Sequence, residues 1–342
     1  MITASLILII FINLISFKTT KADYAVVLIY HKFDEPKSPS TSIDLKTFEN
    51  QMKYLKENKY NVVSLSKLYT YIKNKNIPPK TVVITIDDGY KSTMKAFNIL
   101  KKYNFPFTIF LYMEAVGRYP DFLTKEQIKI LKEYKKVEFG NHSYTHKRLA
   151  RLSKKLTKKE YEDMLIKDTK RAECRFKKLI GYKPKFYAYP YGEYNEIFVK
   201  VIKELGYKAA FTQDPFNVSI NTNKYLIPRQ PIVGSWASIK HFKNILNVEP
   251  LDVEPINPKI GFLEKNPPGR FKAILKNPDK YKNCKLYISE IGWLNLQKHK
   301  NILLSNSDIP FLKRWKNRIG IKCLNKNTKK YATYFYMIIK EK

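Results

Sequence analysis

Residues 81–92, TVVITIDDGYKS, form a β-branched run that stops at two adjacent carboxylates and a glycine. Successive strand residues point to opposite faces, and a strand buried on both faces has no place for charge. Asp87 and Asp88 are therefore expected where the strand ends, and in alternating α/β folds that end carries the chemistry. Asp and Gly are also ordinary turn residues, so this stretch alone leaves a simple turn open.

Strand-like and helix-like segments alternate around this stretch, from residue 23 to about residue 245. Apolar runs predict the strands, and apolar residues at three- and four-residue spacing predict the helices between them. Capping boxes, in which Gln or Glu follows a threonine by three residues, predict helix starts at Thr124 and Thr157. The predicted strands cover residues 24–30, 62–65, 82–86, 107–111, 186–189, 209–212 and 225–227.

These repeated βα units predict an α/β fold in which helices wrap a parallel sheet that is closed, or nearly closed, as a barrel. An open, doubly wound sheet is the alternative. Neither GxGxxG nor GxxxxGK[ST] is present, so nothing supports binding of nucleotide phosphates.

The chain changes character after residue 247. Residues 248–268 hold five prolines and no helical period, which predicts a linker. The short alternating or apolar pieces in residues 269–342 predict a small antiparallel β domain. Cys284 and Cys323 both fall there and are the expected disulfide. Cys174 lies near the apolar stripe of a predicted helix and is expected to pack there.

The N-terminus predicts export. Residues 2–17 are nearly all apolar and are followed by Lys18 and a small-residue site ending at Ala22. This predicts a signal peptide over residues 1–22, with an uncleaved anchor as the alternative. The protein is then secreted, periplasmic or in the cell envelope. The net charge of +34 suits acidic partners, but the lysines are spread along the chain. We therefore expect no nucleic-acid partner, and leave association with an envelope or membrane surface, and the oligomeric state, open.

A second predicted strand end carries two histidines, in residues 137–146, VEFGNHSYTH. The chain has five histidines, and His142 and His146 are four residues apart here. With one aspartate they make two imidazoles and a carboxylate, the ligand set of a catalytic divalent metal that keeps positions open for water. Such a metal lowers the pKa of bound water to about 7, and the other aspartate can accept the proton.

The segments TIDDG and HSYTH resemble the first two motifs of the polysaccharide deacetylases, the NodB-homology domains of carbohydrate esterase family four. The resemblance implies a distorted (β/α) barrel over residues 23–247. It also implies that Asp87 is the general base, and that Asp88, His142 and His146 hold a divalent metal ion. Zinc is the expected metal, with cobalt, nickel and iron as alternatives.

Residues 186–195, FYAYPYGEYN, resemble the family's third motif, which usually reads R-P-P-Y-G. The PYG matches, but Ala188 stands where the family often has an arginine that orients the catalytic aspartate. We expect Arg229, in YLIPRQPI, to take that role. The resemblance further implies that the backbone N–H of Tyr191 stabilises the oxyanion together with the metal.

His31 closes the first predicted strand, in VVLIYHKF. The family's catalytic histidine usually comes late in the domain, and neither His241 nor His299 is a convincing equivalent. In exported deacetylases of the poly-β-1,6-N-acetylglucosamine type the motif order is permuted, and a YH near the N-terminus takes this role. The chain resembles that branch, which implies that His31 is the general acid. The alternative is a structural histidine bonded to backbone.

The predicted function is a metal-dependent hydrolase that removes N-acetyl groups from N-acetylhexosamine residues of a cell-wall or extracellular polysaccharide. An O-acetyl glycan esterase would use the same site. A degenerate glycan-binding protein is the alternative suggested by Ala188. A two-histidine, one-carboxylate iron oxygenase is disfavoured, because the second aspartate has no role in it. The aromatic residues expected to line a sugar groove are Tyr144, Tyr189, Tyr191 and Trp236.

Overall fold

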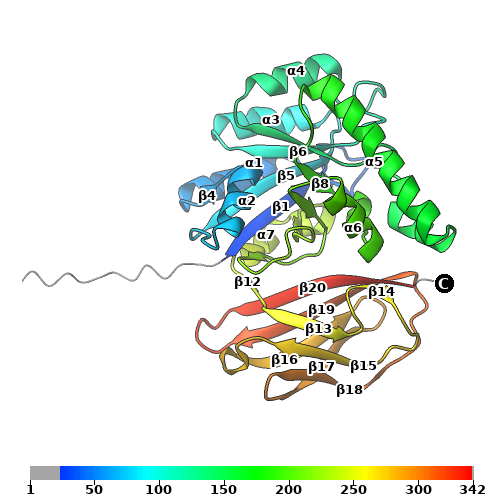
Figure 1. Ribbon diagram of the computed structural model, residues 1–342. Helices are drawn as coiled ribbons and strands as arrows, with labels where there is room; N and C mark the ends of the chain where they lie inside the picture. Colours follow the sequence, from blue (N-terminus) through cyan, green and yellow to red (C-terminus); the bar gives the residue numbers. More distant parts are fainter. Residues whose placement is uncertain (1–23, 341–342) are drawn as a thin grey trace, which may run out of the picture.

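Two nine-stranded sheets organise the chain, one above the other in the view of Figure 1. The computed structural model describes residues 24–340, so the predicted signal segment, residues 1–22, lies outside the described residues. None of the helices in the described range combines the length and apolar character needed to span a membrane.

The first sheet is parallel over most of its width. Its order is β10-β1-β5-β6-β7-β8-β9, with β11 also paired to β1 and β4 to β5. Every residue of β5 is buried, as expected of a β-branched strand covered on both faces. The strands are β1 (Tyr24–Tyr30), β4 (Asn61–Val62), β5 (Thr81–Asp88), β6 (Phe107–Leu111), β7 (Val137–Asn141), β8 (Phe186–Ala188), β9 (Ala209–Phe211), β10 (Val218–Ser219) and β11 (Gln230–Pro231); β2 (Lys32–Phe33) and β3 (Ser42–Ile43) form a separate pair.

A short segment after β9 joins the two ends of this sheet. Ile227 makes a parallel bridge to Phe211 in β9, and β11 pairs in parallel with β1. The sheet therefore curls into the nearly closed barrel that the sequence predicts, rather than the open alternative. The strand predicted at residues 225–227 is wrong. Ile227 forms only an isolated bridge, and Pro228 beside it has no N–H to extend the pairing.

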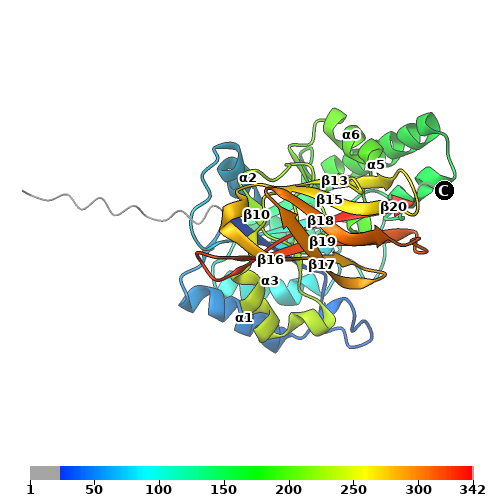
Figure 2. The ribbon, with the colours of Figure 1, turned by 90° about the horizontal axis from the view of Figure 1, so that it is seen from below.

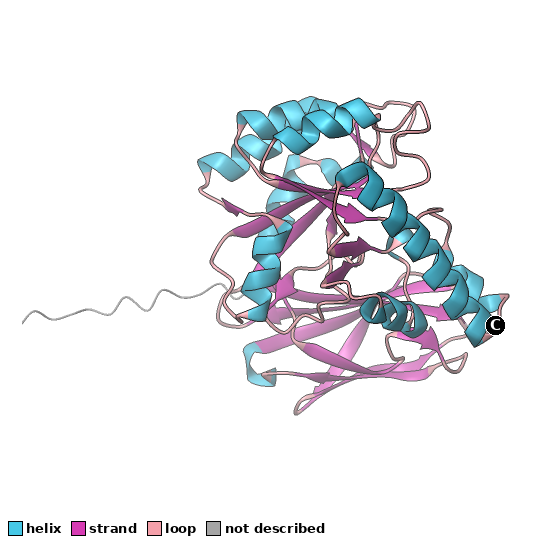
Figure 3. Ribbon diagram, turned by 45° about the horizontal axis from the view of Figure 1, so that its top comes forward, coloured by secondary structure: helices cyan, strands magenta, loops and turns pink. Residues whose placement is uncertain are grey.

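The α-helices lie around the barrel sheet (Figure 3). Both predicted capping boxes are present, at Thr124 and Thr157, and the long helix that starts after Thr157 ends at Gly181, which has a φ of 102°. The helices are α1 (Leu45–Glu57), α2 (Leu65–Lys73), α3 (Thr93–Lys102), α4 (Lys125–Glu133), α5 (Lys158–Ile180), α6 (Glu196–Glu204) and α7 (Ile239–Leu246).

Two local predictions are wrong, each for a local reason. The strand predicted at residues 62–65 is cut short, because the Ser64 side chain caps the start of α2. Cys174 is exposed on α5 instead of packed in its apolar stripe. The buried stripe of α5 includes Ala172 and Phe176, and a residue midway between two positions four apart points to the opposite side of a helix.

The second sheet is mostly antiparallel and has its own core, as predicted for the C-terminal region (Figure 2). The disulfide expected between Cys284 and Cys323 is confirmed, and it joins β16 to β19 on the core side. The strands are β12 (Glu249–Pro250), β13 (Val253–Asn257), β14 (Gly261–Leu263), β15 (Gly269–Leu275), β16 (Tyr281–Ile288), β17 (Gly292–His299), β18 (Ile302–Ile309), β19 (Lys316–Asn325) and β20 (Tyr331–Lys340).

Residues 248–268 are not an unstructured linker, so that prediction is wrong. They supply β12, β13 and β14, which border the second sheet: β12 and β14 pair with β20, and β13 pairs with β15. Proline is tolerated in such edge positions because the missing N–H need not join the ladder. Pro250 in β12 and Pro255 in β13 therefore fit the sheet, although they hid its strands from the sequence pattern.

Candidate active site

The end of β5 presents two aspartates to the inside of the barrel mouth. Asp87 is fully buried and Asp88 is 5% exposed. Asp88 and Gly89 both have a positive φ, 71° and 74°, so the backbone curls immediately after Asp87. A Cβ on Gly89 would lie 2.9 Å from the Leu111 side chain, so this turn requires glycine. The curl lets two adjacent carboxylates face different partners.

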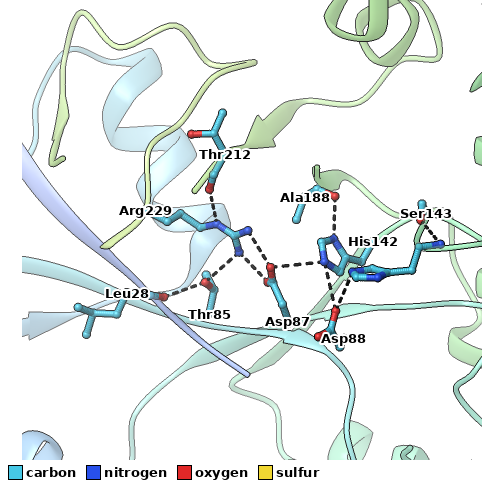
Figure 4. Close-up of polar contacts among 10 residues, drawn as sticks. Leu28, Thr85, Asp87, Asp88, His142, Ser143, Ala188, Thr212 and Arg229 are labelled. Carbon is cyan, nitrogen blue, oxygen red and sulfur yellow. Dashed lines mark hydrogen bonds and ion pairs between the residues drawn. The ribbon is translucent and has the colours of Figure 1, made fainter. Parts of the chain in front are cut away.

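Arg229 holds Asp87 through both carboxylate oxygens (Figure 4). Its Nη1 donates to Asp87 Oδ1 at 2.6 Å and its Nη2 to Oδ2 at 2.8 Å. Its Nε donates to the Thr212 carbonyl at 2.8 Å, and the whole side chain is buried. Burial by itself would raise the pKa of Asp87, but the guanidinium and the neighbouring imidazoles lower it below its ordinary value. Arg229 stands directly before β11, in the segment that joins β9 to β1.

Asp88, His142 and His146 face one another beside this pair. Asp88 Oδ1 lies 3.3 Å from His142 Nε2 and 3.0 Å from His146 Nε2. Burial would raise the pKa of Asp88, but the two imidazoles hold it well below its ordinary value. Asp87 Oδ2 lies 3.5 Å from His142 Nε2, so both carboxylates border the same space.

The orientation of His142 comes from a backbone contact that the sequence does not reveal. Its Nδ1 lies 2.8 Å from the carbonyl oxygen of Ala188, at the end of β8. The carbonyl can only accept, so Nδ1 carries a proton, and Nε2 is left as the ring nitrogen that could bind a metal ion. Ala188 thus supports the site through its main chain.

The donor atoms fit a divalent cation. The three side chains offer one carboxylate oxygen and two imidazole nitrogens, all within 4.8 Å of one another. Asp88 Oδ1 is buried and accepts no hydrogen bond from the described residues, and a buried anionic oxygen left in that state is costly. A bound cation would remove this cost.

The turn that carries His146 is held from α5 by Asp168. Ser143 and His146 both have a positive φ, 67° and 49°, which needs support in non-glycine residues. Asp168 accepts from the N–H groups of Tyr144 and Thr145, at 2.9 and 3.1 Å, and from the Thr145 hydroxyl at 2.7 Å. Sequence reasoning missed Asp168. Its position on the buried stripe of α5 was the available signal.

His31 lies beside the two aspartates, at the end of β1. The charges of Asp88 and Asp87 act on it, but burial outweighs them and lowers the pKa of His31 below its ordinary value. Its Nδ1 is buried and has no hydrogen-bond partner among residues 24–340. The alternative of a structural histidine bonded to backbone therefore has no support at this atom.

Tyr191 forms one side of the mouth. Its φ is 57° and its ring is 38% exposed, 4.8 Å from the His146 ring and 4.1 Å from the Arg148 guanidinium. The neighbouring Gly192 is required, because a Cβ there would lie 2.6 Å from the Gln213 side chain. The Tyr191 N–H donates to no protein acceptor in the described part of the chain.

Of the four aromatic residues expected to line a sugar groove, two are exposed and two are buried. Tyr191 is 38% exposed and Trp236 44% exposed. Tyr144 and Tyr189 are buried, at 6% and 0%, because they pack in the two cores of the barrel domain, so those predictions are wrong. A cleft of about 650 Å³ is lined by residues that include Asp34, Pro39, Lys95, Gly234 and Ser235, and Trp236 is not among its lining residues.

The C-terminal sheet contacts the loops of this mouth, which sequence reasoning did not foresee. The buried Glu193 forms ion pairs with Arg148 and with Lys316 of β19. These contacts link the second sheet to the residue that follows the PYG motif.

A second contact reaches the segment that holds Arg229. Arg318 of β19 donates to the Gln213 carbonyl at 3.0 Å and lies 3.5 Å from the buried carboxylate of Asp214. Asp214 also accepts from the Tyr194 hydroxyl, and its carbonyl accepts from the Arg229 N–H. The second sheet therefore packs against the mouth at two neighbouring points.

Comparisons with known proteins agree with this geometry. Residues 74–210 match the family described as polysaccharide deacetylase. A poly-beta-1,6-N-acetyl-D-glucosamine N-deacetylase of Staphylococcus aureus (strain MRSA252) is 30% identical over 217 residues, which cover 62% of this chain and 75% of that protein. The protein of the same name from Staphylococcus epidermidis is 27% identical over 193 residues, 55% of this chain and 67% of that one.

Two solved structures show the same fold. The structure of IcaB from Ammonifex degensii has a TM-score of 0.55 and 25% identity, and covers 65% of this chain and 97% of that chain. The Streptococcus pyogenes deacetylase PplD, in complex with acetate, has a TM-score of 0.58 and 22% identity, and the match covers 65% of this chain and 98% of that chain. Each of these matches leaves about a third of this chain uncovered.

Proposed function

The chain belongs to the polysaccharide deacetylase family, and on that premise we propose that it hydrolyses N-acetyl groups on N-acetylhexosamine residues of a polysaccharide of the poly-β-1,6-N-acetylglucosamine type. One observation carries the proposal. The metal-fitting group of Asp88, His142 and His146 borders the same space as Asp87, which Arg229 holds by two hydrogen bonds. Ala188 suggested a degenerate site without an arginine to orient the catalytic aspartate. The contact of Arg229 with Asp87 supports an intact site instead.

Each polar group has a task in amide hydrolysis. Asp88, His142 and His146 would hold a divalent metal, and when bound it polarises a carbonyl oxygen and makes water easier to deprotonate. Asp87 accepts the proton of the attacking water, because Arg229 keeps its carboxylate ionised and fixed in direction.

The leaving nitrogen and the carbonyl oxygen need partners of their own. We assign to the Tyr191 N–H, which donates to no acceptor among the described residues, a hydrogen bond to the carbonyl oxygen as negative charge develops there. We assign to His31 the transfer of a proton to the departing nitrogen, and the burial that lowers its pKa makes its protonated form a stronger acid.

Zinc is the metal we propose, since two imidazoles and a carboxylate suit it, with cobalt, nickel or iron as alternatives. We also propose that the protein acts outside the cytoplasm. The apolar segment of residues 2–17 supports this, and so does the disulfide, because such bonds persist in oxidising compartments. The partner is the acetylated polysaccharide itself.

Acetate release tests the function. Purified protein supplied with Zn²⁺ is expected to release acetate from poly-N-acetylglucosamine, to lose this activity on chelation, and to regain it when Zn²⁺ is added back. Asp87→Asn is expected to lower the rate by about 100-fold or more, because the base is removed. The exposed Asp163→Asn on α5 is the matched control.

The choice of substrate separates this proposal from its alternative. Faster release from O-acetylated xylan than from N-acetylated glycan would identify an esterase instead. Full activity of Asp87→Asn would refute the assignment of the base.

A further inference from the structure

A row of aromatic rings lies on the face of the second sheet that turns away from that sheet's own core. On β20 the same face also supplies Met337 and Ile339, which pack against the barrel domain. Tyr287 of β16 lies directly opposite Trp293 of β17. On its other side Tyr287 lies opposite Gly320 of β19, and Gly320 lies opposite Phe335 of β20. The four positions thus cross four neighbouring strands on the face away from the core. We call Tyr287, Trp293 and Phe335 the aromatic row.

The glycine in the row makes it continuous. A Cβ on Gly320 would lie 2.2 Å from the Phe335 ring, so that ring occupies the space above Gly320 on the side of Tyr287. The ring centroids of Tyr287 and Phe335 are 6.3 Å apart, and those of Tyr287 and Trp293 are 5.2 Å apart. Trp293 at the outer end is 45% exposed. The row crosses three strand spacings, about 14 Å.

The inner end of the row adjoins the active-site mouth. Arg318 precedes Gly320 by two residues and so lies on the same face of β19. Its guanidinium donates to the Gln213 carbonyl, and Gln213 packs directly against Gly192, beside Tyr191. One sheet face therefore runs from the catalytic mouth out to Trp293.

We propose that the aromatic row binds the N-acetylated polysaccharide next to the stretch being deacetylated, an inference that rests on the proposed function. A hexopyranose ring presents an apolar C–H face, which stacks on the electron-rich face of an aromatic ring. Trp293 is exposed, and Tyr287 and Phe335 are each partly exposed, so the row offers apolar surface beside the mouth, the kind of patch that soluble proteins keep for a ligand.

The flanking charges select the acetylated form of the chain. The Lys322 ammonium lies over Trp293, 4.4 Å from the ring centroid. Lys285 lies directly opposite Lys322 on the neighbouring strand. An N-acetylated chain is neutral and is not repelled by these ammonium groups. Each acetyl group removed leaves an amine that is protonated at neutral pH, so the product is repelled. The row thus holds substrate and releases product.

Affinity electrophoresis through gels that contain poly-N-acetylglucosamine tests the row at equilibrium. The full-length protein carries Asp87→Asn, so that the polymer is not consumed. Adding Trp293→Ala and Tyr287→Ala together is expected to weaken binding about tenfold or more. Phe311→Ala is the matched control, since Phe311 is in the same domain, is 57% exposed and lies outside the row. Binding equal to that of the Phe311→Ala control would overturn the proposal.

Turnover by the protein with Asp87 intact separates this proposal from the proposed function. The paired row variants are expected to lose acetate release from the long polymer and to keep it on a short oligosaccharide that occupies only the mouth. Polymer binding through the row without any acetate release would refute the function and leave the row standing. Equal or tighter binding of the deacetylated polymer at low salt would overturn the selection by charge.

Discussion

At the scale of single residues, the site depends on which side chain fixes the direction of Asp87. Arg229 lies 142 residues further along the chain, yet it meets both oxygens of that carboxylate. A guanidinium is suited to this role because its two parallel N–H groups match a carboxylate, which a lysine ammonium cannot do. We therefore propose that Arg229, from the segment directly before β11, takes the role of the arginine that the family motif has at the position of Ala188.

Substitution of Arg229 is expected to impair both activity and stability. Arg229→Ala leaves a buried carboxylate without its partner, which costs about 3 to 5 kcal/mol of unfolding free energy. Arg229→Lys keeps the positive charge but loses the paired hydrogen bonds, and is expected to fold and to lose about 10-fold or more in kcat.

Chemical denaturation and acetate release measure the two effects. Arg270→Ala serves as the control, because Arg270 lies exposed on the second sheet, away from the site. A kcat for Arg229→Lys equal to that of the unsubstituted protein would show that Asp87 does not need the bidentate contact.

At the scale of elements, the metal-binding turn depends on its contact with α5. The turn from Ser143 to His146 contains two residues with positive φ, and Asp168 is the carboxylate that ties it down. His142 directly follows strand β7, whereas the position of His146 depends on the hydrogen bonds from Asp168 of α5 to the turn. The next α-helix in the chain thus holds the turn that carries His146, one of the three side chains that could hold a metal ion.

Asp168→Ala is expected to weaken metal binding by about 10- to 100-fold, because the turn loses three hydrogen bonds and His146 is no longer held. Titration with Zn²⁺ against a competing chelator measures the affinity. Asp163→Ala, an exposed aspartate on the same helix, is expected to bind like the parent protein. An unchanged Zn²⁺ affinity in Asp168→Ala would contradict the supporting role of the helix.

At the scale of the whole molecule, the two sheets meet at the catalytic mouth. Lys316 of β19 pairs with Glu193, which is two residues after Tyr191. Arg318 contacts Gln213 and Asp214, which directly follow Thr212, whose carbonyl accepts from the Arg229 side chain. The second sheet is therefore positioned to stiffen the mouth as well as to offer the aromatic row.

Arg318→Ala is expected to lower kcat about tenfold on a short oligosaccharide, because small displacements of reacting groups are costly, while Zn²⁺ affinity stays unchanged. The control is Arg314→Ala, an arginine whose side chain donates to the Ser289 carbonyl of its own domain. Arg318→Lys is expected to restore part of the rate. Equal kcat values for Arg318→Ala and Arg314→Ala would show that the contact serves packing alone.

The sequence by itself determined the ends of the barrel strands and the residues with the right chemistry there, because burial excludes charge from strand interiors and leaves a local pattern. TIDDG, HSYTH and PYG could be placed in this way, as could the disulfide and the capped helices. The tertiary structure alone decided three things: the Ala188 carbonyl on His142, the support from Asp168, and the contact of the second sheet with the mouth. The first and the third depend on a backbone carbonyl or on residues far apart in the chain, whose meeting is set by how the barrel curls and leaves no periodic signal. Asp168 showed in the sequence only as a polar residue on the buried stripe of α5, and its contact with the turn became visible in the structure. The prolines of residues 248–268 misled for the same reason, since only the completed sheet shows which strands lie at an edge.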